Sequence, residues 1–559
     1  MKPFSYLGWL PPLLAGALCG ACGSDSADDG PAGDALALVA VTVGGQSGLS
    51  DFEGVSPDAD FVLDFSATLD ASTVDANVYL LDAAGGRVAA TDRFDGAMRV
   101  TLTPDAALNA YASYRLIVNA GLRSAAGAAI VTGKVIGVRT GLDTSDKFPQ
   151  ITDEELLTKV QRQTFRYFWE GAEPESGMAR ERTSSGATVA TGGTGFGVMA
   201  MTVAAERGFV ARSEACERVQ RIVTFLSERA VSYHGAFSHW IDGRTGATLP
   251  FSADDDGADL VETALLFEGL LTARAYFDGA DAAESRLRGD ITRLWEAVEW
   301  DFFTKEGAEQ ALYWHWSPDK GWAMNMPVQG WNEALIVYVL AAASPTHPVG
   351  REVYDAGWAR NGAMRNGRMF YDTVLPLGED YGGPLFWAHY SFLGIDPRGL
   401  SDAYADYWEQ VCAHTRINYA YCVANPKHYA GYGADCWGLT ASDVPDGYAA
   451  SSPTDDRGVI APTAALSSMP YMPDESMAAL RFFYYKLGDR LWSDYGFIDA
   501  FDLTDGWFDT NMHIAIDQGP IVVMIENYRT GLPWRLLMSD DDVRAGLTKL
   551  GFTIGAGGR

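Results

Sequence analysis

The spacing of apolar residues changes near residue 150, and this change constrains the fold more than any other feature of the chain. Before that point, apolar residues alternate or cluster in short runs such as 61–65 and 114–118, which is the pattern of β-strands. After it they recur at helical spacing, for example at Leu156 and Val160. The 559 residues also exceed what one hydrophobic core usually serves. A β domain followed by a larger α domain is therefore predicted.

The first domain, residues 36–140, is predicted to be a small β-sandwich. About seven short strands in about 100 residues, separated by turn signals such as Gly85-Gly86, are typical of two packed sheets. The segment resembles bacterial Ig-like domains in residues 65–70, 102–104 and 114–116. Such a module is usually a spacer, and no cluster of reactive side chains occurs in it.

The N-terminus has the features of an export signal. An early lysine precedes an apolar run, residues 7–18, that is too short to cross a bilayer as a mature helix. Small residues before Cys22 and a Gly/Ser/Asp tract after it resemble a bacterial lipoprotein processing site. We therefore expect a lipoprotein signal peptide at 1–22, lipidation of Cys22, a flexible tether at 23–35, and an exported protein that only this lipid anchors to a bacterial membrane, in the periplasm or at the cell surface. Lipidation of Cys19 and plain secretion are the alternatives.

Four further cysteines follow, at positions 216, 412, 422 and 436. The last three lie in a Tyr-, Asn- and Gly-rich stretch that is expected to be a loop, where an exported protein can form a disulfide. The close paired spacings of a structural zinc site are missing, so no metal is predicted.

The charge of the chain excludes some partners. Asp and Glu number 73 against 42 Lys and Arg, a formal charge of −31. Such a surface repels nucleic acids and anionic membranes, whereas a neutral polysaccharide is unaffected, although solubility alone could account for much of the charge. The 16 Trp and 25 Tyr residues also offer flat surfaces for sugar rings.

After a linker at 141–150, residues 151–559 are predicted to be helical. Thr152 can cap the first helix, and acidic residues follow in its first turn. Long Gly- and aromatic-rich loops favour a closed ring of helical hairpins over an up-down bundle, whose loops are short. The further helices are expected at 194–207, 214–231, 258–277, 288–303, 331–343, 401–416, 474–487 and 536–550.

The loops of this domain repeatedly place an acidic residue beside Trp, His, Asn or Gly. They comprise residues 235–243, 254–263, 313–317, 330–333, 382–390, 436–443, 516–520 and 525–529. Together with 191–197, 462–468 and 531–532, they resemble the glycoamylase-like domains of glycoside hydrolase family 144 over residues 151–555. The resemblance implies a multidomain protein with an Ig-like β-sandwich followed by an all-α (α/α)6 barrel. It also implies endo-acting, inverting hydrolysis of β-1,2-glucan. We expect a monomer without a cofactor.

Hydrolysis of a glycosidic bond needs an acid that protonates the leaving oxygen and usually a carboxylate that activates water. Glu333 precedes an apolar helical run, and apolar neighbours would raise its pKa, as a general acid requires. Asp517 precedes Gly519-Pro520, a turn that could hold it rigidly. Matching to the family's motifs makes Glu333 the acid and Asp517 the base.

The other candidates are assigned to substrate binding. Asp259 and Glu262 lie near the start of a helix and can face one cavity, with Asp255 beside them. Three histidines next to aromatic residues can bind sugar hydroxyls, and no HExxH-like spacing suggests zinc instead. The remaining assigned residues are His239, His315, His389, Trp240, Trp314, Trp331, Asn332, Trp387, Trp437, Asp443 and Glu526.

Each assignment has a structural alternative. Acids at a helix start can simply stabilise its N-terminus, Glu526 could pair with Arg529, and Asp443 could be a turn residue. The tryptophans divide between stacking platforms and core. Two other functions stay open: an exo-acting or glycosyl-transferring relative, and a non-catalytic surface glycan-binding lipoprotein. The presence of both Glu333 and Asp517 disfavours the latter.

Overall fold

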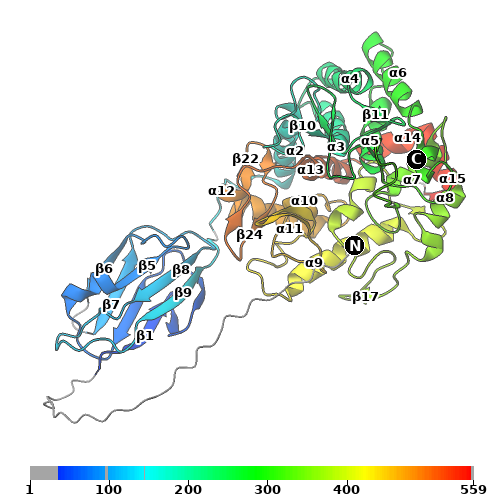
Figure 1. Cartoon of the computed structure of the whole chain (residues 1–559). Coiled ribbons are helices and arrows are strands. Elements are labelled where there is room, and N and C mark those ends of the chain that lie inside the picture. The colour runs from blue at the N-terminus through cyan, green and yellow to red at the C-terminus, as the bar shows by residue number, and fades with distance from the viewer. Residues whose placement is uncertain (1–34, 95–97, 144, 556–559) are drawn as a thin grey trace. The chain divides into compact units, whose positions relative to one another are not determined.

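The computed structural model describes residues 35–94, 98–143 and 145–555 (Figure 1). The chain divides into two compact units, Met1–Ala107 with Tyr114–Val138, and Leu108–Ser113 with Arg139–Arg559. Cys22 and most of the expected tether lie outside the described residues. Of the helices that the structure describes, none is both long and apolar enough to cross a membrane.

The first unit is built from two sheets, the five-stranded one antiparallel throughout. One has the strand order β2-β1-β4-β7-β6 and the other β3-β9-β8-β5. Alternate residues of β4 are buried, as the period of two predicts. The strands are β1 (Leu38–Val43), β2 (Gln46–Gly48), β3 (Phe52–Val55), β4 (Phe61–Phe65), β5 (Val78–Leu81), β6 (Ala90–Phe94), β7 (Arg99–Pro104), β8 (Ser113–Val118) and β9 (Lys134–Thr140).

The second unit has a set of almost wholly buried helices, each packed against a more peripheral one. The buried helices form a series in which α7 packs on α5, α5 on α3, α3 on α13 and α13 on α10. Their bounds are α3 (Thr191–Glu206), α5 (Leu260–Tyr276), α7 (Leu335–Ala343), α10 (Pro462–Leu466) and α13 (Ala515–Arg529).

The peripheral helices pair with this series: α4 with α3, α6 and α14 with α5, α15 with α7, α2 with α13 and α11 with α10. They are α2 (Asp153–Trp169), α4 (Arg212–Glu228), α6 (Ala282–Glu296), α11 (Pro473–Arg481), α14 (Leu532–Ser539) and α15 (Asp541–Leu550), and α9 (Tyr407–Ala424) lies between α7 and α10 in the chain. Helix α2 begins with the expected Thr152 cap, which Glu155 completes into a capping box.

Glycines allow α3 and α5 to cross at very short range. A Cβ on Gly195 would lie 2.2 Å from the carbonyl oxygen of Leu265, and one on Gly269 would lie 2.1 Å from the carbonyl oxygen of Gly195. The Gly-rich segment 191–197 is therefore the start of a helix whose small residues serve close packing.

Two expectations about local structure are wrong. Residues 516–520 do not form a turn, because α13 runs through Gly519 and Pro520. Packing overrides the two helix breakers: a Cβ on Gly519 would lie 2.4 Å from the Cβ of Phe196, so the helix needs glycine there. The cysteine-bearing stretch is a loop only in part, since Cys412 and Cys422 lie on α9 whereas Cys436 follows it outside any helix, and the four cysteines in the described part of the chain are free.

Candidate active site

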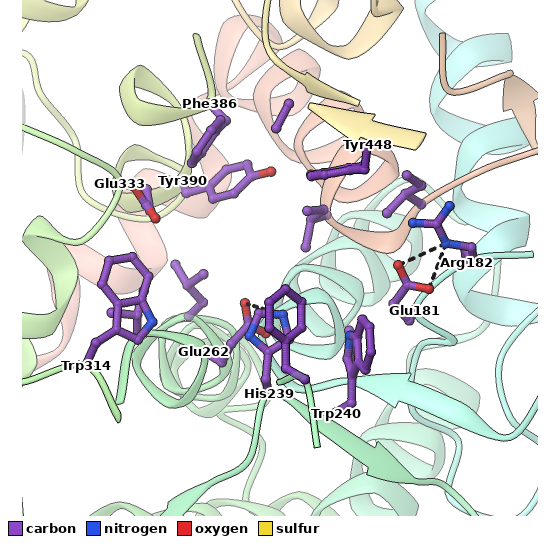
Figure 2. Close-up of a pocket in the computed structure, with 17 residues that line it drawn as sticks. Glu181, Arg182, His239, Trp240, Glu262, Trp314, Glu333, Phe386, Tyr390 and Tyr448 are labelled. Atoms are coloured by element: carbon purple, nitrogen blue, oxygen red, sulfur yellow. Dashed lines mark hydrogen bonds and ion pairs between the residues drawn. The ribbon is translucent and has the colours of Figure 1, made fainter. Parts of the chain in front are cut away.

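A pocket of about 370 Å³ opens where the N-terminal ends of α5, α7 and α13 meet several loops (Figure 2). Its size is in the range of small-ligand sites. Most of its surface is apolar or aromatic, with a few charged groups among the rings. The pocket wall consists of Glu181, Arg182, Ala190, His239, Trp240, Phe251, Val261, Glu262, Leu265, Trp314, Glu333, Phe386, Tyr390, Ala441, Tyr448, Ile514 and Ile516.

Glu333 lies on the pocket wall directly before the N-cap of α7, Ala334. Its backbone is held in place because the Ser391 hydroxyl donates to the Glu333 carbonyl and accepts from the N–H of Ile336 at 3.0 Å. Burial, and then the charges of Asp259 and Glu262, raise the pKa of the Glu333 carboxyl to about 7. Glu333 can therefore donate a proton at neutral pH.

Beside it, two histidines and two aspartates form a charged network. Pairing of β15 (Ala258–Asp259) with β16 (His315–Trp316) sets Asp259 opposite His315. The Asp259 carboxylate accepts from the Nδ1 of His239 at 2.9 Å and also caps α5, while the Nε2 of His315 lies 3.1 Å from Asp255. Burial opposes the charged imidazoles, but the carboxylates outweigh it and raise the pKa to about 9 for His239 and about 10 for His315. Both imidazoles are therefore cations that balance the aspartates.

Glu262 projects from the first turn of α5 into the pocket. One of its oxygens accepts from the backbone N–H of Gly192 at 2.6 Å, and the other lies 4.0 Å from the Nε2 of His239. Burial raises the pKa of the Glu262 carboxyl, against the opposite effect of His239. The result is a fixed carboxyl group that can bind sugar hydroxyls.

Asp517 lies behind the pocket wall in a second group of acids. Asp517 is 2% exposed, and its Oδ2 has no hydrogen-bond partner among the residues that the structure describes. Burial, and then the charge of Asp499, raise the pKa of Asp517 well above its ordinary value, and burial also raises the pKa of Asp499 and Asp509 to about 7. Asp443 differs because both of its oxygens accept from Arg182, at 2.8 and 2.9 Å. This group therefore shares protons at neutral pH.

Two sets of these side chains have the residue types that bind metals: His239 with Asp255 and Asp259, and Asp443 with Asp499 and Asp509. In the first set the imidazolium ions already balance the carboxylates. In the second, Arg182 occupies both oxygens of Asp443, which leaves fewer carboxylates than a calcium site uses. Neither set needs a cation for charge balance.

Comparison with known proteins identifies both domains. The glucoamylase family model, named Glycoamylase, matches residues 325–541, and the bacterial Ig-like domain model matches 39–136. An endo-β-1,2-glucanase structure from Chitinophaga pinensis, with sophorotriose and glucose, is 50% identical over 72% of this chain and 99% of its own, with a TM-score of 0.71. A β-1,2-glucanase structure from Parabacteroides distasonis is 37% identical over 93% of this chain and 73% of its own, with a TM-score of 0.70. The chain belongs to glycoside hydrolase family 144.

The name of another relative describes an exo-acting enzyme instead of an endo-acting one. The exo-β-1,2-glucooligosaccharide sophorohydrolase of P. distasonis is 46% identical over 421 residues, 72% of this chain. The matched region is 58% of that relative's length. Both endo- and exo-acting enzymes therefore occur among the relatives of this family 144 protein.

Some predicted site residues of the family 144 domain lie on the pocket wall and others directly behind it. Glu333, Glu262, His239, Trp240 and Trp314 are on the wall. The second set contacts wall residues or their partners without lining the pocket, and comprises Asp255, Asp259, His315, Asp443 and Asp517.

Three predicted aromatic contacts are corrected by where the rings pack, two of them buried and Trp387 half-buried. The indole of Trp437 is wholly buried and donates to the carbonyl of Glu475 at 3.3 Å. Trp331 packs in the core, and its indole N–H donates to the Nδ1 of His414 at 3.3 Å. Trp387 also packs against the core and is not on the pocket wall. These large rings fill the helical domain, as the structural alternative proposed.

The remaining three predicted residues also have structural roles. Burial lowers the pKa of His389 to about 3, and its Nε2 pairs with the Ser468 hydroxyl at 3.0 Å. Glu526 accepts from Arg207 at 2.7 Å rather than from Arg529, because it faces inward on α13. The Asn332 side chain accepts from the N–H of Ala334 at 2.9 Å and so supports the start of α7.

The sequence analysis missed several residues of the wall. Phe386 and Tyr390 occur in the 382–390 loop, but its 3-10 turns, Leu385–Ala388 and Tyr390–Phe392, present these rings instead of Trp387 and His389. Glu181, Arg182, Phe251 and Tyr448 belong to segments that the analysis did not single out. One feature of the sequence could have indicated the second acidic group: Asp499 is an acidic residue within the apolar run 497–501.

Proposed function

We propose that the helical domain hydrolyses β-1,2-glucan, with Glu333 as general acid and Asp517 as general base. The observation that carries this proposal is Glu333, a carboxyl group on the pocket wall whose pKa is raised to about 7. The names of relatives, a β-1,2-glucanase and a sophorohydrolase, supply the linkage.

In the proposed reaction, Glu333 gives its proton to the glycosidic oxygen as the bond from that oxygen to C1 breaks. A water molecule attacks C1 from the opposite face and loses a proton toward Asp517. The configuration at C1 is inverted, and the two carboxyl groups then exchange their protons with solvent. The raised pKa of Asp517 makes it a stronger proton acceptor than an ordinary aspartate once it is ionised.

The composition of the pocket wall fits a neutral sugar. Aromatic rings of Trp240, Trp314 and Phe386 can stack on the apolar faces of glucose units. His239 and Glu262 are held rigidly by their partners and can exchange hydrogen bonds with hydroxyl groups. Three residues act indirectly, because they fix the charge and orientation of His239: Asp255, Asp259 and His315.

We propose that the helices close into an (α/α)6 barrel. The buried series from α7 through α5, α3 and α13 to α10, with a peripheral partner for each member, supports this arrangement. It also explains why several helix N-termini converge on one pocket.

Product profiles test the function and distinguish its alternatives. Endo-cleavage would convert linear β-1,2-glucan into a ladder of lengths and would also open cyclic β-1,2-glucan. Exo-cleavage would release a single short product from linear chains and leave the cyclic substrate intact, and transfer would give products longer than the substrate. Binding of glucan without any product would refute the enzymatic proposal and support a glycan-binding lipoprotein. We propose the endo mode, in line with the C. pinensis relative.

We further propose that the enzyme is a monomer that is exported and anchored through lipidated Cys22. The support is the apolar run at 7–18 and the small residues before Cys22. Radiolabelled palmitate should enter the protein in bacteria, and the Cys22→Ala variant should lose the label. A label that persists in this variant would contradict lipidation at Cys22.

A further inference from the structure

Two aromatic residues of the pocket wall are about half open to solvent. Phe251 is 51% exposed and Tyr448 is 48% exposed, whereas the other residues of the wall are less exposed. A wall residue that is exposed lies where the pocket meets the solvent. Phe251 and Tyr448 therefore mark the mouth of the pocket.

Tyr448 is carried by a hairpin that is anchored in the site. It lies on β21 (Gly447–Ala450), and its partner across the hairpin is Asp443 on β20 (Ala441–Val444). Directly opposite residues of an antiparallel pair have their side chains on the same face. The Asp443 carboxylate accepts from Arg182 of the pocket wall, at 2.8 and 2.9 Å. This ion pair therefore fixes the face of the hairpin that presents Tyr448 to the pocket.

Phe251 is held at the mouth by contacts behind its ring. The ring centroid lies 4.3 Å from that of His239 and 4.9 Å from that of Trp240. The positive charge of the His239 imidazolium is attracted to an aromatic ring at this distance. Lys320 donates to the carboxylate of Asp254 at 3.0 Å and so contacts the same loop. The ring is positioned by these contacts although half of the residue stays exposed.

The pocket can enclose only part of a glucan chain. Its volume of about 370 Å³ is in the range of small-ligand sites, whereas the proposed substrate is a polymer. A chain that is cut between inner units must continue through the mouth into solvent. The units that emerge there pass Phe251 and Tyr448. Single exposed apolar residues are common on protein surfaces, but two positioned rings at one mouth indicate a binding surface.

We propose that Phe251 and Tyr448 bind the sugar units that emerge from the pocket and so give the enzyme a preference for long chains. The apolar faces of glucose units stack on such rings. Figure 2 shows Tyr448 on the side of the pocket that holds Glu181 and Arg182, away from Glu333. Glu181 and Arg182 are paired at 2.9 Å and offer acceptors and donors to the hydroxyl groups of a stacked unit.

This inference rests on the proposed function, and binding in a Glu333→Gln background tests it without turnover. Titration calorimetry compares a trimer and a decamer of β-1,2-linked glucose, because only the decamer extends far beyond a pocket of this size. Phe251→Ala and Tyr448→Ala should each weaken binding of the decamer about fivefold, the effect of one aromatic contact. Binding of the trimer should change less than about twofold, which also shows that the pocket is intact. In the active enzyme, each substitution should raise KM for long glucan about fivefold, with kcat within about twofold.

Tyr528→Ala is the matched control, because Tyr528 is 44% exposed on α13 but lies off the pocket wall. This variant should bind both oligosaccharides as the Glu333→Gln parent does. Unchanged binding of the decamer in either mouth variant, or equal losses for trimer and decamer, would overturn the inference. A wild-type enzyme that binds the decamer but releases no product would refute the proposed hydrolysis instead, so the two failures are distinguishable.

Discussion

Replacement of Glu333 by Gln should abolish activity and stabilise the fold at the same time. Glu333 is protonated in the folded protein up to about pH 7, whereas in the unfolded chain it ionises near its ordinary pKa of 4.5. Stability that is present below pH 4.5 is therefore lost as the pH rises toward 7, because only the unfolded state releases the proton. A difference of about 2.5 pKa units corresponds to about 3 kcal/mol at neutral pH.

Glutamine has the same shape but never ionises, so it avoids this loss. The free energy of unfolding of Glu333→Gln should therefore equal that of the wild type at pH 4.5. At pH 8 it should exceed the wild-type value by about 2 kcal/mol, after allowance for an imperfect fit of the amide. Denaturant unfolding at several pH values measures it, and product release measures kcat. In the wild type, kcat/KM should fall as the pH rises through about 7, because Glu333 must be protonated to act.

Glu217→Gln provides the control, since Glu217 is an exposed residue of α4 away from the pocket. This variant should match the wild type in both activity and the pH dependence of stability. A stability difference for Glu333→Gln that is the same at pH 4.5 and pH 8, or an active variant, would refute the account of Glu333.

The other predictions concern the domains, the helix crossing and the histidine network. Deletion of residues 1–140 removes the first unit together with Leu108–Ser113 of the second, and it should leave a soluble, active enzyme because the core of the second unit lies in its helices; a folded but inactive product would contradict this. Gly195→Ala should lower the free energy of unfolding by more than about 2 kcal/mol, whereas Gly289→Ala, in an open position on α6, should raise it by up to about 1 kcal/mol; equal effects in chemical unfolding would contradict the close crossing. The raised pKa of His315 implies stability that is present below pH 6.5 and lost as the pH rises through about 10, and His315→Gln should remove this loss in melting curves from pH 7 to 10.

The sequence predicted the architecture where local patterns and packing agree. The run at 61–65 became β4 with its alternation intact, and Thr152 caps α2 as expected. The prediction failed where packing overrides local preference. Gly519 and Pro520 suggested a turn, but α13 runs through both, and the place of Gly519 is set by close contact with Phe196, which is distant in sequence.

The candidate site was predictable only for residues whose chemistry is evident without burial. Glu333 and Glu262 stood out as acids at the start of apolar helices, and both reach the pocket wall. Tyr390 and Asp499 were not singled out. The apolar run around Asp499 was a signal in the sequence, whereas the unpartnered Tyr390 hydroxyl and Asp499 Oδ1 are evident only in the folded protein. Phe386 lines the pocket wall where Trp387 was predicted to do so. This difference depends on a 3-10 turn that the sequence pattern did not indicate.

The stereochemistry of the first product tests the central claim, that Asp517 activates water and forms no bond to the sugar. If it is a base, water attacks the face opposite the leaving oxygen, and proton NMR in the first minutes of hydrolysis should show the new reducing end as the α-anomer. Asp517→Asn should lose most of this rate, and added azide should not restore it with retained configuration. Appearance of the β-anomer first would mean retention through a glycosyl-enzyme, and the role given to Asp517 would be wrong.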